Sequence, residues 1–301
     1  MIAKTSFGEK MDESYEGAAE ALKQSANELK NLRPAYQELL KFFESVFLAQ
    51  EKSRSSVRIE PLRISPEIQE KKISEKFPLL DMSEFIIDTA ESISLLKTLC
   101  HIAKDGNETL RTEATSVQQA IETGQLDPIL LFDYQLKRQG TPPALSSVSD
   151  TVMNFLGYNS ILPSLTVCSK QASAILSTQD PWKTGYCPVC GSMPGLSILE
   201  KEGERFYVCS FCRHQWAAPR LFCAFCSNTN GKTLHYFYSD QESEYRVDAC
   251  DNCNRYIKTI DTRKTSRKIY PPLEMIATIH LDILASDAKL VPVYDWNPIG
   301  I

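Results

Sequence analysis

Four Cys-x-x-Cys pairs lie within 67 residues of this chain and supply eight of its ten cysteines. A Cys-x-x-Cys turn directs two sulfurs to one side of the backbone, and two such turns enclose one metal ion in a tetrahedral thiolate cage. Eight thiolates therefore predict two four-sulfur metal sites. The predicted metal ligands are Cys187, Cys190, Cys209, Cys212, Cys223, Cys226, Cys250 and Cys253.

The spacing of the pairs indicates how they group. Eighteen residues separate the first pair from the second, 23 separate the third from the fourth, and only 10 lie between the second and the third. The first spacing falls in, and the second lies near, the range typical of ribbon-type zinc sites. We therefore expect sequential grouping, first with second and third with fourth, and interleaved grouping stays open.

Composition argues against the other uses of paired cysteines. Residues 1–20 are polar and charged, so no apolar signal segment points to an oxidising compartment. A chain of 301 residues can also bury a core without disulfide cross-links. A thioredoxin-like redox pair would need a βαβ context, which the sequence does not indicate. Metal binding by reduced thiolates is the interpretation that remains.

Charge and hydropathy limit the function classes. The net charge is −5 and the pI is about 5.6, so the whole chain has no attraction to nucleic acid or anionic membrane. No run approaches the 18 apolar residues of a membrane-spanning helix. Together with reduced thiolates, these features predict a soluble cytoplasmic protein without a membrane span.

The first 180 residues are predicted to be helical. Gly and Pro are sparse within long segments rich in Ala, Leu, Glu, Lys and Gln. Residues 54–77, broken by two prolines, should form a loop with a short helix. Cys100 and Cys168 fall on apolar helix faces and are expected to be buried structural thiols. The expected helices are 12–32, 34–53, 83–104, 107–123, 127–138, 146–156 and 160–176.

The composition then changes to aromatic and β-branched residues with frequent Gly and Asn, after a predicted linker at 177–186. Short strands are expected at 196–199, 205–208, 234–238, 245–249 and 256–260, and one helix at about 273–285. Each cysteine turn would then lie at the edge of a hairpin, as in zinc ribbons and rubredoxin-like modules. The predicted fold is a helical domain (1–180), two tandem four-cysteine ribbons (181–222 and 223–265), and a C-terminal helix and tail (266–301).

A closed four-thiolate site leaves no coordination position for substrate or water, so its main contribution is folding energy. Thiolates suit both zinc and iron, and an iron site could also carry one electron. Two metal ions per chain, iron or zinc, are therefore expected. His214 and His235 lie near the cysteines and are predicted to pack or face solvent rather than to bind metal. We find no hydrolase, zinc-protease, Walker or dinucleotide motif, which favours a binding protein over an enzyme.

Binding of nucleic acid by the ribbons is a further hypothesis. Residues 181–270 contain 13 Lys and Arg against 9 Asp and Glu, and a basic run begins at Arg263. The excess is small and acidic residues are interspersed, so a solvated basic turn explains it without nucleic acid.

The cysteine region resembles a known family, FdhE, the formate dehydrogenase accessory proteins. The resemblance rests on Tyr186-Cys-Pro-Val-Cys-Gly-Ser, on Arg205-Phe-Tyr-Val-Cys-Ser-Phe-Cys followed by Trp216 and Arg220, on Cys223-Ala-Phe-Cys, and on Cys250-Asp-Asn-Cys-Asn-Arg. It extends into the last helix at Ala277, Leu281 and Asp282 and to Asn297-Pro298, and covers roughly residues 185–300. In the helical part it is limited to a Phe-x-x-x-Phe-x-x-Gln pattern that begins at Phe43 and ends at Gln50.

The resemblance implies a cytoplasmic maturation factor that contacts the formate dehydrogenase catalytic subunit before export, with a helical domain and two rubredoxin-like modules. It also implies that the eight cysteines match the family's ligand positions and that iron and a redox contribution belong to the picture. One departure is that only the first Cys-x-x-Cys is followed by glycine, Gly191. That weakens a strict rubredoxin analogy and keeps zinc in consideration.

The sequence supports three hypotheses about function. The first is a chaperone-like maturation factor that docks the catalytic subunit through its ribbon face, with Arg205, Trp216 and Arg220 in the contact surface. In the alternative for these residues, the tryptophan packs beneath a hairpin and the arginines pair with local acids. The second function is a rubredoxin-like iron protein that acts on an oxidoreductase, and the third is a nucleic-acid-binding zinc-ribbon protein.

Overall fold

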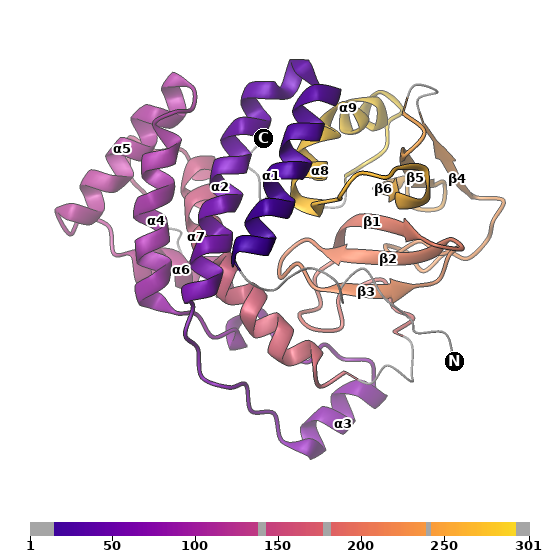
Figure 1. Ribbon diagram of the computed structural model, residues 1–301. Helices are drawn as coiled ribbons and strands as arrows, with labels where there is room; N and C mark the ends of the chain where they lie inside the picture. The colour runs from indigo at the N-terminus through magenta and orange to yellow at the C-terminus, as the bar shows by residue number, and fades with distance from the viewer. Residues whose placement is uncertain (1–14, 138–142, 177–181, 239–241, 293–301) are drawn as a thin grey trace.

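The computed structural model describes residues 15–137, 143–176, 182–238 and 242–292. Most helices of residues 15–173 lie on one side of the molecule and a six-stranded sheet lies on the other, with the two C-terminal helices beside the sheet (Figure 1). Among the described residues, no helix is both long enough and apolar enough to cross a membrane. The predicted order of a helical part, a cysteine-bearing β part and C-terminal helices is confirmed.

The helical part contains seven α-helices in the described residues, and the predicted short helix inside the 54–77 loop is present. Their bounds are α1 Tyr15–Leu32, α2 Gln37–Ser56, α3 Pro66–Ser74, α4 Thr89–Ala103, α5 Glu108–Glu122, α6 Pro128–Lys137 and α7 Asp150–Ser173. Helix α4 begins later than the predicted residue 83, because the Asp88 side chain caps it by accepting from the Glu91 N–H at 3.0 Å. The expected helix start at Asp12, the expected helix end at Arg138, the first half of the linker (177–181), and Asn297-Pro298 lie outside the described residues.

Helix α7 is one continuous helix where two were predicted, and two residues explain the difference. Gly157 permits close packing of α6, because a Cβ atom there would lie 2.8 Å from the side chain of Leu131. Pro163 has no N–H to donate to the carbonyl of Asn159, four residues earlier. Gln50 on α2 supplies the missing donor, since its Nε2 donates to Asn159 O at 3.0 Å and to Asn159 Oδ1 at 2.9 Å. A side chain from another helix thus keeps α7 intact across its proline.

The β part forms one sheet rather than two separate ones. The strands are β1 Pro194–Glu200, β2 Glu204–Cys209, β3 Gln215–Ala218, β4 Leu234–Phe237, β5 Tyr245–Cys250 and β6 Arg255–Asp261, in the order β3-β2-β1-β6-β5-β4. Neighbours within each group of three are antiparallel. The two groups join through parallel pairing of β1 with β6, in the register Ser197 to Thr259. Strand β3 was not predicted, because its Gln-Trp-Ala-Ala sequence is too short to show an alternating pattern.

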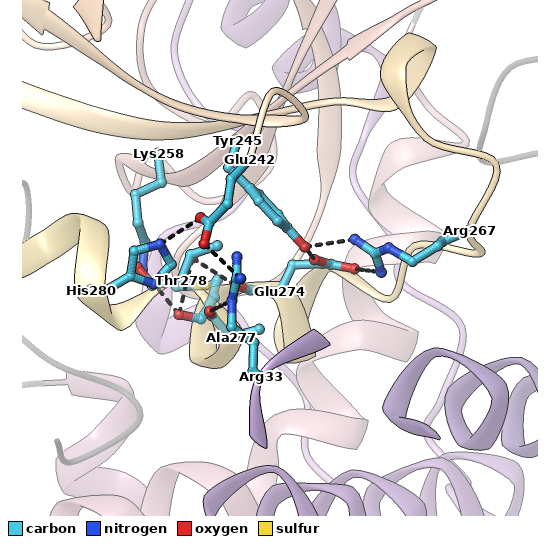
Figure 2. Close-up of polar contacts among 10 residues, drawn as sticks. Arg33, Glu242, Tyr245, Lys258, Arg267, Glu274, Ala277, Thr278 and His280 are labelled. Atoms are coloured by element: carbon cyan, nitrogen blue, oxygen red, sulfur yellow. Dashed lines mark hydrogen bonds and ion pairs between the residues drawn. The ribbon is translucent and has the colours of Figure 1, made fainter. Parts of the chain in front are cut away.

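Two C-terminal helices, α8 Pro271–Ala277 and α9 Ile279–Asp287, replace the single predicted helix. Cationic side chains bind the carbonyls at the break (Figure 2). The Lys258 ammonium donates to Met275 O at 3.0 Å and Thr278 O at 3.5 Å, and Arg33 Nε donates to Ala277 O at 3.2 Å. These bonds satisfy the last carbonyls of α8 and allow the chain to turn at Thr278.

The buried core has two parts, and the first four-cysteine group belongs to the larger one. That core joins α1, α2 and α4–α7 to Cys187, Cys190, Cys209 and Cys212. A smaller core lies between the sheet and α9 and is built from residues such as Ile198, Val247, Ile260 and Leu281. The proposed division into folding units at 180, 222 and 265 stays a prediction.

Candidate metal centres

The four sulfur atoms of the first two cysteine pairs lie within 4.8 Å of one another. Cys187 and Cys190 precede β1, whereas Cys209 ends β2 and Cys212 follows it. The Sγ atoms of Cys187 and Cys212 are 3.8 Å apart, and those of Cys190 and Cys209 are 3.4 Å apart. All four cysteines are buried. We call this group the first quartet.

The third and fourth pairs form a second quartet of the same kind. The Sγ atoms of Cys223 and Cys253 are 3.7 Å apart, as are those of Cys226 and Cys250. Cys226 and Cys253 are only half-buried, so this group lies nearer the surface than the first. The quartets therefore group sequentially, as the spacing predicted, and not in the interleaved way.

The sulfur geometry fits one tetrahedral metal ion per quartet. Metal–sulfur bonds of about 2.3 Å place the corners of a tetrahedron about 3.8 Å apart, close to the distances observed. All eight cysteines are free thiols, which excludes the disulfide framework in this structure. Burial raises the pKa of Cys187 and of Cys209, whereas at Cys190 hydrogen bonds from neighbouring cysteines outweigh burial and lower the pKa. A divalent cation would balance the negative charge of the grouped thiolates, so the donor set and the electrostatics both suit zinc or iron.

The four cysteine turns share one backbone conformation even though three of them lack glycine. The residue after each second cysteine has a positive φ: 74° at Gly191, 59° at Arg213, 58° at Ser227 and 54° at Asn254. The turns also repeat a hydrogen bond, as between Cys223 N and Asn228 O at 2.8 Å. The missing glycines therefore do not change the backbone conformation of the turn.

Polar hydrogens surround the first quartet. The backbone N–H groups of Phe211 and Cys212 each donate to Cys209 Sγ at 3.4 Å. The Ser169 hydroxyl on α7 donates to Cys212 Sγ at 3.5 Å. Such bonds orient thiolate ligands and tune the metal they hold. The donor from α7 means that the helical part contributes directly to this site.

Further contacts fix the first quartet to the helical part. Leu79 N donates to Pro188 O at 3.0 Å and Leu80 N donates to Val189 O at 2.8 Å, so the loop after α3 pairs with the first cysteine turn. The buried Tyr158 hydroxyl on α7 donates to the carbonyl of Phe211 within the second turn. The helices and the first quartet therefore form one packed unit.

The second quartet has a different surrounding, made of its own loops. Asn228 Nδ2 donates to Cys250 Sγ at 3.4 Å, and Asn252 Nδ2 lies 3.6 Å from Cys226 Sγ. The linker backbone packs directly against the third cysteine turn at Gly185. A Cβ atom at this position would lie only 1.8 Å from Ala224 O. Two of its sulfurs remain partly accessible, which distinguishes it chemically from the enclosed first quartet.

Neither nearby histidine joins a quartet. The His214 ring stacks on Trp216 at 6.3 Å, and burial lowers its pKa to about 4, so it is neutral near pH 7. His235 lies on β4 with Nδ1 3.3 Å from Asp251 Oδ1. Cys100 and Cys168 are buried thiols in the helical core, as predicted.

The three residues assigned to a partner surface have different environments. Arg205 is buried, and its Nη1 atom contacts Asp248 Oδ2 at 2.8 Å and Ser197 Oγ at 3.1 Å. Trp216 is 5% exposed and packs on the Tyr207 ring at 5.7 Å. These two occupy the positions of the packing alternative, whereas Arg220 is exposed. A partner contact through any of the three stays a prediction.

The sequence did not predict several polar residues that hydrogen-bond to the cysteines or to the cysteine turns. Ser169, Tyr158 and Asn228 reach their sulfur or carbonyl partners across gaps of 22 to 53 residues. Only Asn228 had a visible signal, because it lies two residues beyond the third Cys-x-x-Cys turn.

The fold and the two quartets together define a class: a helical protein that carries paired four-cysteine ribbons on a shared sheet. Residues 186–220 match the family model described as FdhE, central domain. A "Protein FdhE homolog" of Aquifex aeolicus (strain VF5) is 34% identical over 152 residues, which are 49% of this chain and 52% of that protein. "Protein FdhE" of Escherichia coli (strain K12) is 32% identical over 108 residues, which are 35% of this chain and 33% of that protein. The matched region thus spans about half the length of the first relative and a third of the second.

A solved structure has the same fold across nearly the whole chain. It is described as the crystal structure of the FdhE protein from Pseudomonas aeruginosa, with a TM-score of 0.66 and 14% identity. The match covers 94% of this chain and 96% of that one, so it includes the helical part, which sequence similarity left vague. The resemblance of this chain to the FdhE family is confirmed.

Proposed function

We propose that this chain is a maturation factor for formate dehydrogenase that holds two metal ions and binds the catalytic subunit through its cysteine-bearing sheet. The observation that carries the proposal is the pair of thiolate quartets, built into a fold and sequence that resemble FdhE proteins. Because both quartets fill all four ligand positions with protein, their ions would shape a surface rather than activate a substrate. This chemistry supports an accessory protein and not an enzyme.

The metal ligands in this proposal are the eight cysteines of the two quartets, with zinc or iron as the ion. The first quartet would fix the sheet to the helices, since its cysteines lie in the main core. The second would shape an outer face, since two of its sulfurs are partly accessible. A maturation factor that binds the catalytic subunit before export would act in the cytoplasm.

Arg220 is the residue of the predicted partner surface that solvent reaches most readily. A Cβ atom added at Gly203 would lie 3.1 Å from the Arg220 guanidinium carbon and 3.2 Å from Arg263 Nη1, so two guanidinium groups converge above this glycine. Leu221 beside it is 62% exposed. A cationic group next to an exposed apolar side chain fits an acidic, partly apolar patch on a partner.

Co-purification tests the proposal. The full-length protein, loaded with metal, is immobilised and offered the formate dehydrogenase catalytic subunit. We expect retention by the wild type, weaker retention by Arg220→Glu, and wild-type retention by Lys97→Glu, an exposed change on α4. If the metal-loaded wild type retains no catalytic subunit, the proposed function is wrong.

A second candidate, a rubredoxin-like redox protein, is favoured by the half-buried second quartet, because electron exchange requires an accessible metal site. Anaerobic purification followed by visible spectroscopy and elemental analysis separates the two. A red ferric four-thiolate spectrum supports this candidate, and a colourless protein containing two zinc ions removes it.

A further inference from the structure

Strand β4 forms one outer edge of the six-stranded sheet, and among the described residues β5 is its only neighbouring strand (Figure 1). A strand edge carries a row of backbone N–H and C=O groups that can pair with another chain. Proteins commonly block such edges with proline, lysine or a bulge. Strand β4 contains neither proline nor lysine, and its register with β5 has no shift. Its edge is therefore open to an added strand.

The pairing with β5 determines which backbone groups of β4 face outward. Hydrogen-bonded pairs alternate with non-hydrogen-bonded pairs along an antiparallel ladder. Asp251 N donates to Thr233 O at 3.0 Å, which fixes the alternation. His235, opposite Ala249, therefore bonds to β5, whereas the next residue, Tyr236, directs its N–H and C=O away from it. In the described part of the chain, neither of these two groups has a hydrogen-bond partner.

Two exposed tyrosines lie beside this open edge. Tyr236 is 55% exposed and Tyr238 is 47% exposed, and their ring centroids are 6.2 Å apart with 23° between the ring planes. Both side chains lie on the face of the sheet opposite to α9, because Phe237 between them packs against the smaller core. Exposed aromatic rings of this kind supply the apolar contact area that a docked segment needs.

A cation lies over each of the two rings. Arg246 Cζ is 4.4 Å from the ring centroid of Tyr236, and Lys264 Nζ is 5.4 Å from that of Tyr238. Single-stranded nucleic acid binds to aromatic side chains by stacking its bases on their faces. Because a cation already occupies one face of each ring, this pair suits the side chains of a polypeptide better than a run of bases.

The two ends of the edge differ in charge. At the tyrosine end, Arg205 and Arg246 share the single carboxylate of Asp248, at 2.8 Å and 2.9 Å, which leaves one positive charge in excess. At the other end, Leu234 pairs with Cys250 of the second quartet, whose four thiolates retain negative charge when a divalent ion is bound. The edge as a whole therefore has no positive surplus, but it is polarised along its length. A segment that places an acidic side chain at the tyrosine end is complementary to this arrangement.

The tyrosine end of β4 is continuous with the partner surface predicted around Arg220. The guanidinium groups of Arg220 and Arg263 converge above Gly203. The residue after Arg263 is Lys264, whose ammonium group lies over the Tyr238 ring. A partner that contacts Arg220 can therefore reach β4 across the end of the sheet.

We propose that β4 binds an extended segment of the formate dehydrogenase catalytic subunit as an added strand of the sheet. The backbone N–H and C=O of Tyr236 pair with the segment, and the two tyrosine rings contact its alternate side chains. An acidic side chain of the segment lies against Arg246. This inference rests on the proposed function and adds to it the strand that makes the contact and the form of the partner segment.

Hydrogen exchange tests the proposed strand pairing. The full-length, metal-loaded protein is measured alone and in complex with the catalytic subunit, by mass spectrometry of peptides that cover β4. The Tyr236 amide has no partner in the free protein, so it exchanges fast, and pairing should protect it. We expect slower exchange in β4 and in one segment of the catalytic subunit when the complex forms. Unchanged exchange across β4 in a complex that has formed would overturn the proposal.

Substitutions at Tyr236 separate the ring contact from the backbone contact. Tyr236→Ala removes the ring but keeps the N–H, and should weaken binding of the catalytic subunit about fivefold. Tyr236→Pro also removes the outward N–H, at an edge position where proline leaves the bonds to β5 intact, and should weaken binding about threefold more. Phe77→Ala, which removes a ring that is 57% exposed beyond α3, is the matched control and should bind like the wild type. Tyr236→Ala binding as tightly as the control, or Tyr236→Pro binding as tightly as Tyr236→Ala, would contradict the proposed contact.

The outcomes separate this inference from the proposed function. If the wild type retains no catalytic subunit, the proposed function is wrong and the β4 contact is wrong with it. If the wild type retains the subunit while Tyr236→Ala binds equally well and β4 exchange is unchanged, only the β4 contact is wrong. A single-stranded oligothymidylate, added at low salt, should not displace the subunit. Displacement that requires Tyr236 would identify the tyrosine pair as a nucleic-acid site and overturn the proposal.

Discussion

Replacing Gln50 by leucine tests the account of how α7 stays continuous across Pro163. Leucine has nearly the volume of glutamine, so the change removes two buried hydrogen bonds to Asn159 with little cavity formation. Depriving a buried acceptor of its donor costs about 1–3 kcal/mol. Two such acceptors on one residue give an expected loss of about 2–6 kcal/mol in the free energy of unfolding.

A second substitution makes the test specific. Pro163→Ala returns a backbone N–H that can donate to Asn159 O, which replaces one of the two bonds that Gln50 makes. Gln50→Leu should therefore cost about 1–2 kcal/mol less in the Pro163→Ala background than in the wild type, a coupling that a double-mutant cycle measures.

The assay is urea unfolding of the full chain in metal-saturated buffer, followed by far-ultraviolet circular dichroism. Gln24→Leu, on the exposed face of α1, is the matched control and should change stability by less than about 0.5 kcal/mol. The reasoning is refuted if Gln50→Leu costs the same in both backgrounds, or no more than the control.

Three further predictions concern the metal sites and the C-terminal helices. Cys187→Ser and Cys250→Ser should each lower the metal content by one ion, measured by elemental analysis, and only the first should broadly destabilise the helical part, because its quartet lies in the main core. Two retained ions in either variant would contradict the ligand assignment. A chelator should empty the half-buried second quartet before the enclosed first one, which a time course of metal release resolves; simultaneous release would show that burial does not control access. Arg267→Met should lower the unfolding free energy by about 3–5 kcal/mol, because it leaves the fully buried Glu274 without its cation. A loss below about 1 kcal/mol would mean that this carboxyl is already neutral.

The sequence was most informative where spacing along the chain determines geometry. The cysteine turns are local structures, and the short gap between the second and third pairs left sequential grouping as the simpler arrangement. The helical part was visible from composition for the same reason. Helix ends were placed less well, as at α4, because capping by Asp88 depends on a single side chain.

What could not be predicted depends on contacts between distant residues. The continuity of α7 requires a side chain 109 residues earlier, and the break between α8 and α9 requires Arg33, which lies 244 residues before Ala277. A cavity beside the first quartet is lined by residues of α2, α7, the second cysteine turn and α8, which are distant in the sequence. No periodic pattern in the sequence records any of these contacts, so packing alone determines them.

The parallel pairing of β1 with β6 has a consequence for the order in which the protein can form during synthesis. The first ribbon is translated early, but the inner edge of its sheet has no neighbour until Thr259–Asp261 emerge, some 62 positions later in the chain. Until then the nascent polypeptide exposes an open strand edge beside a finished thiolate cage. A ribosome that stalls in this interval would release a fragment able to hold one ion and inclined to associate with other strands.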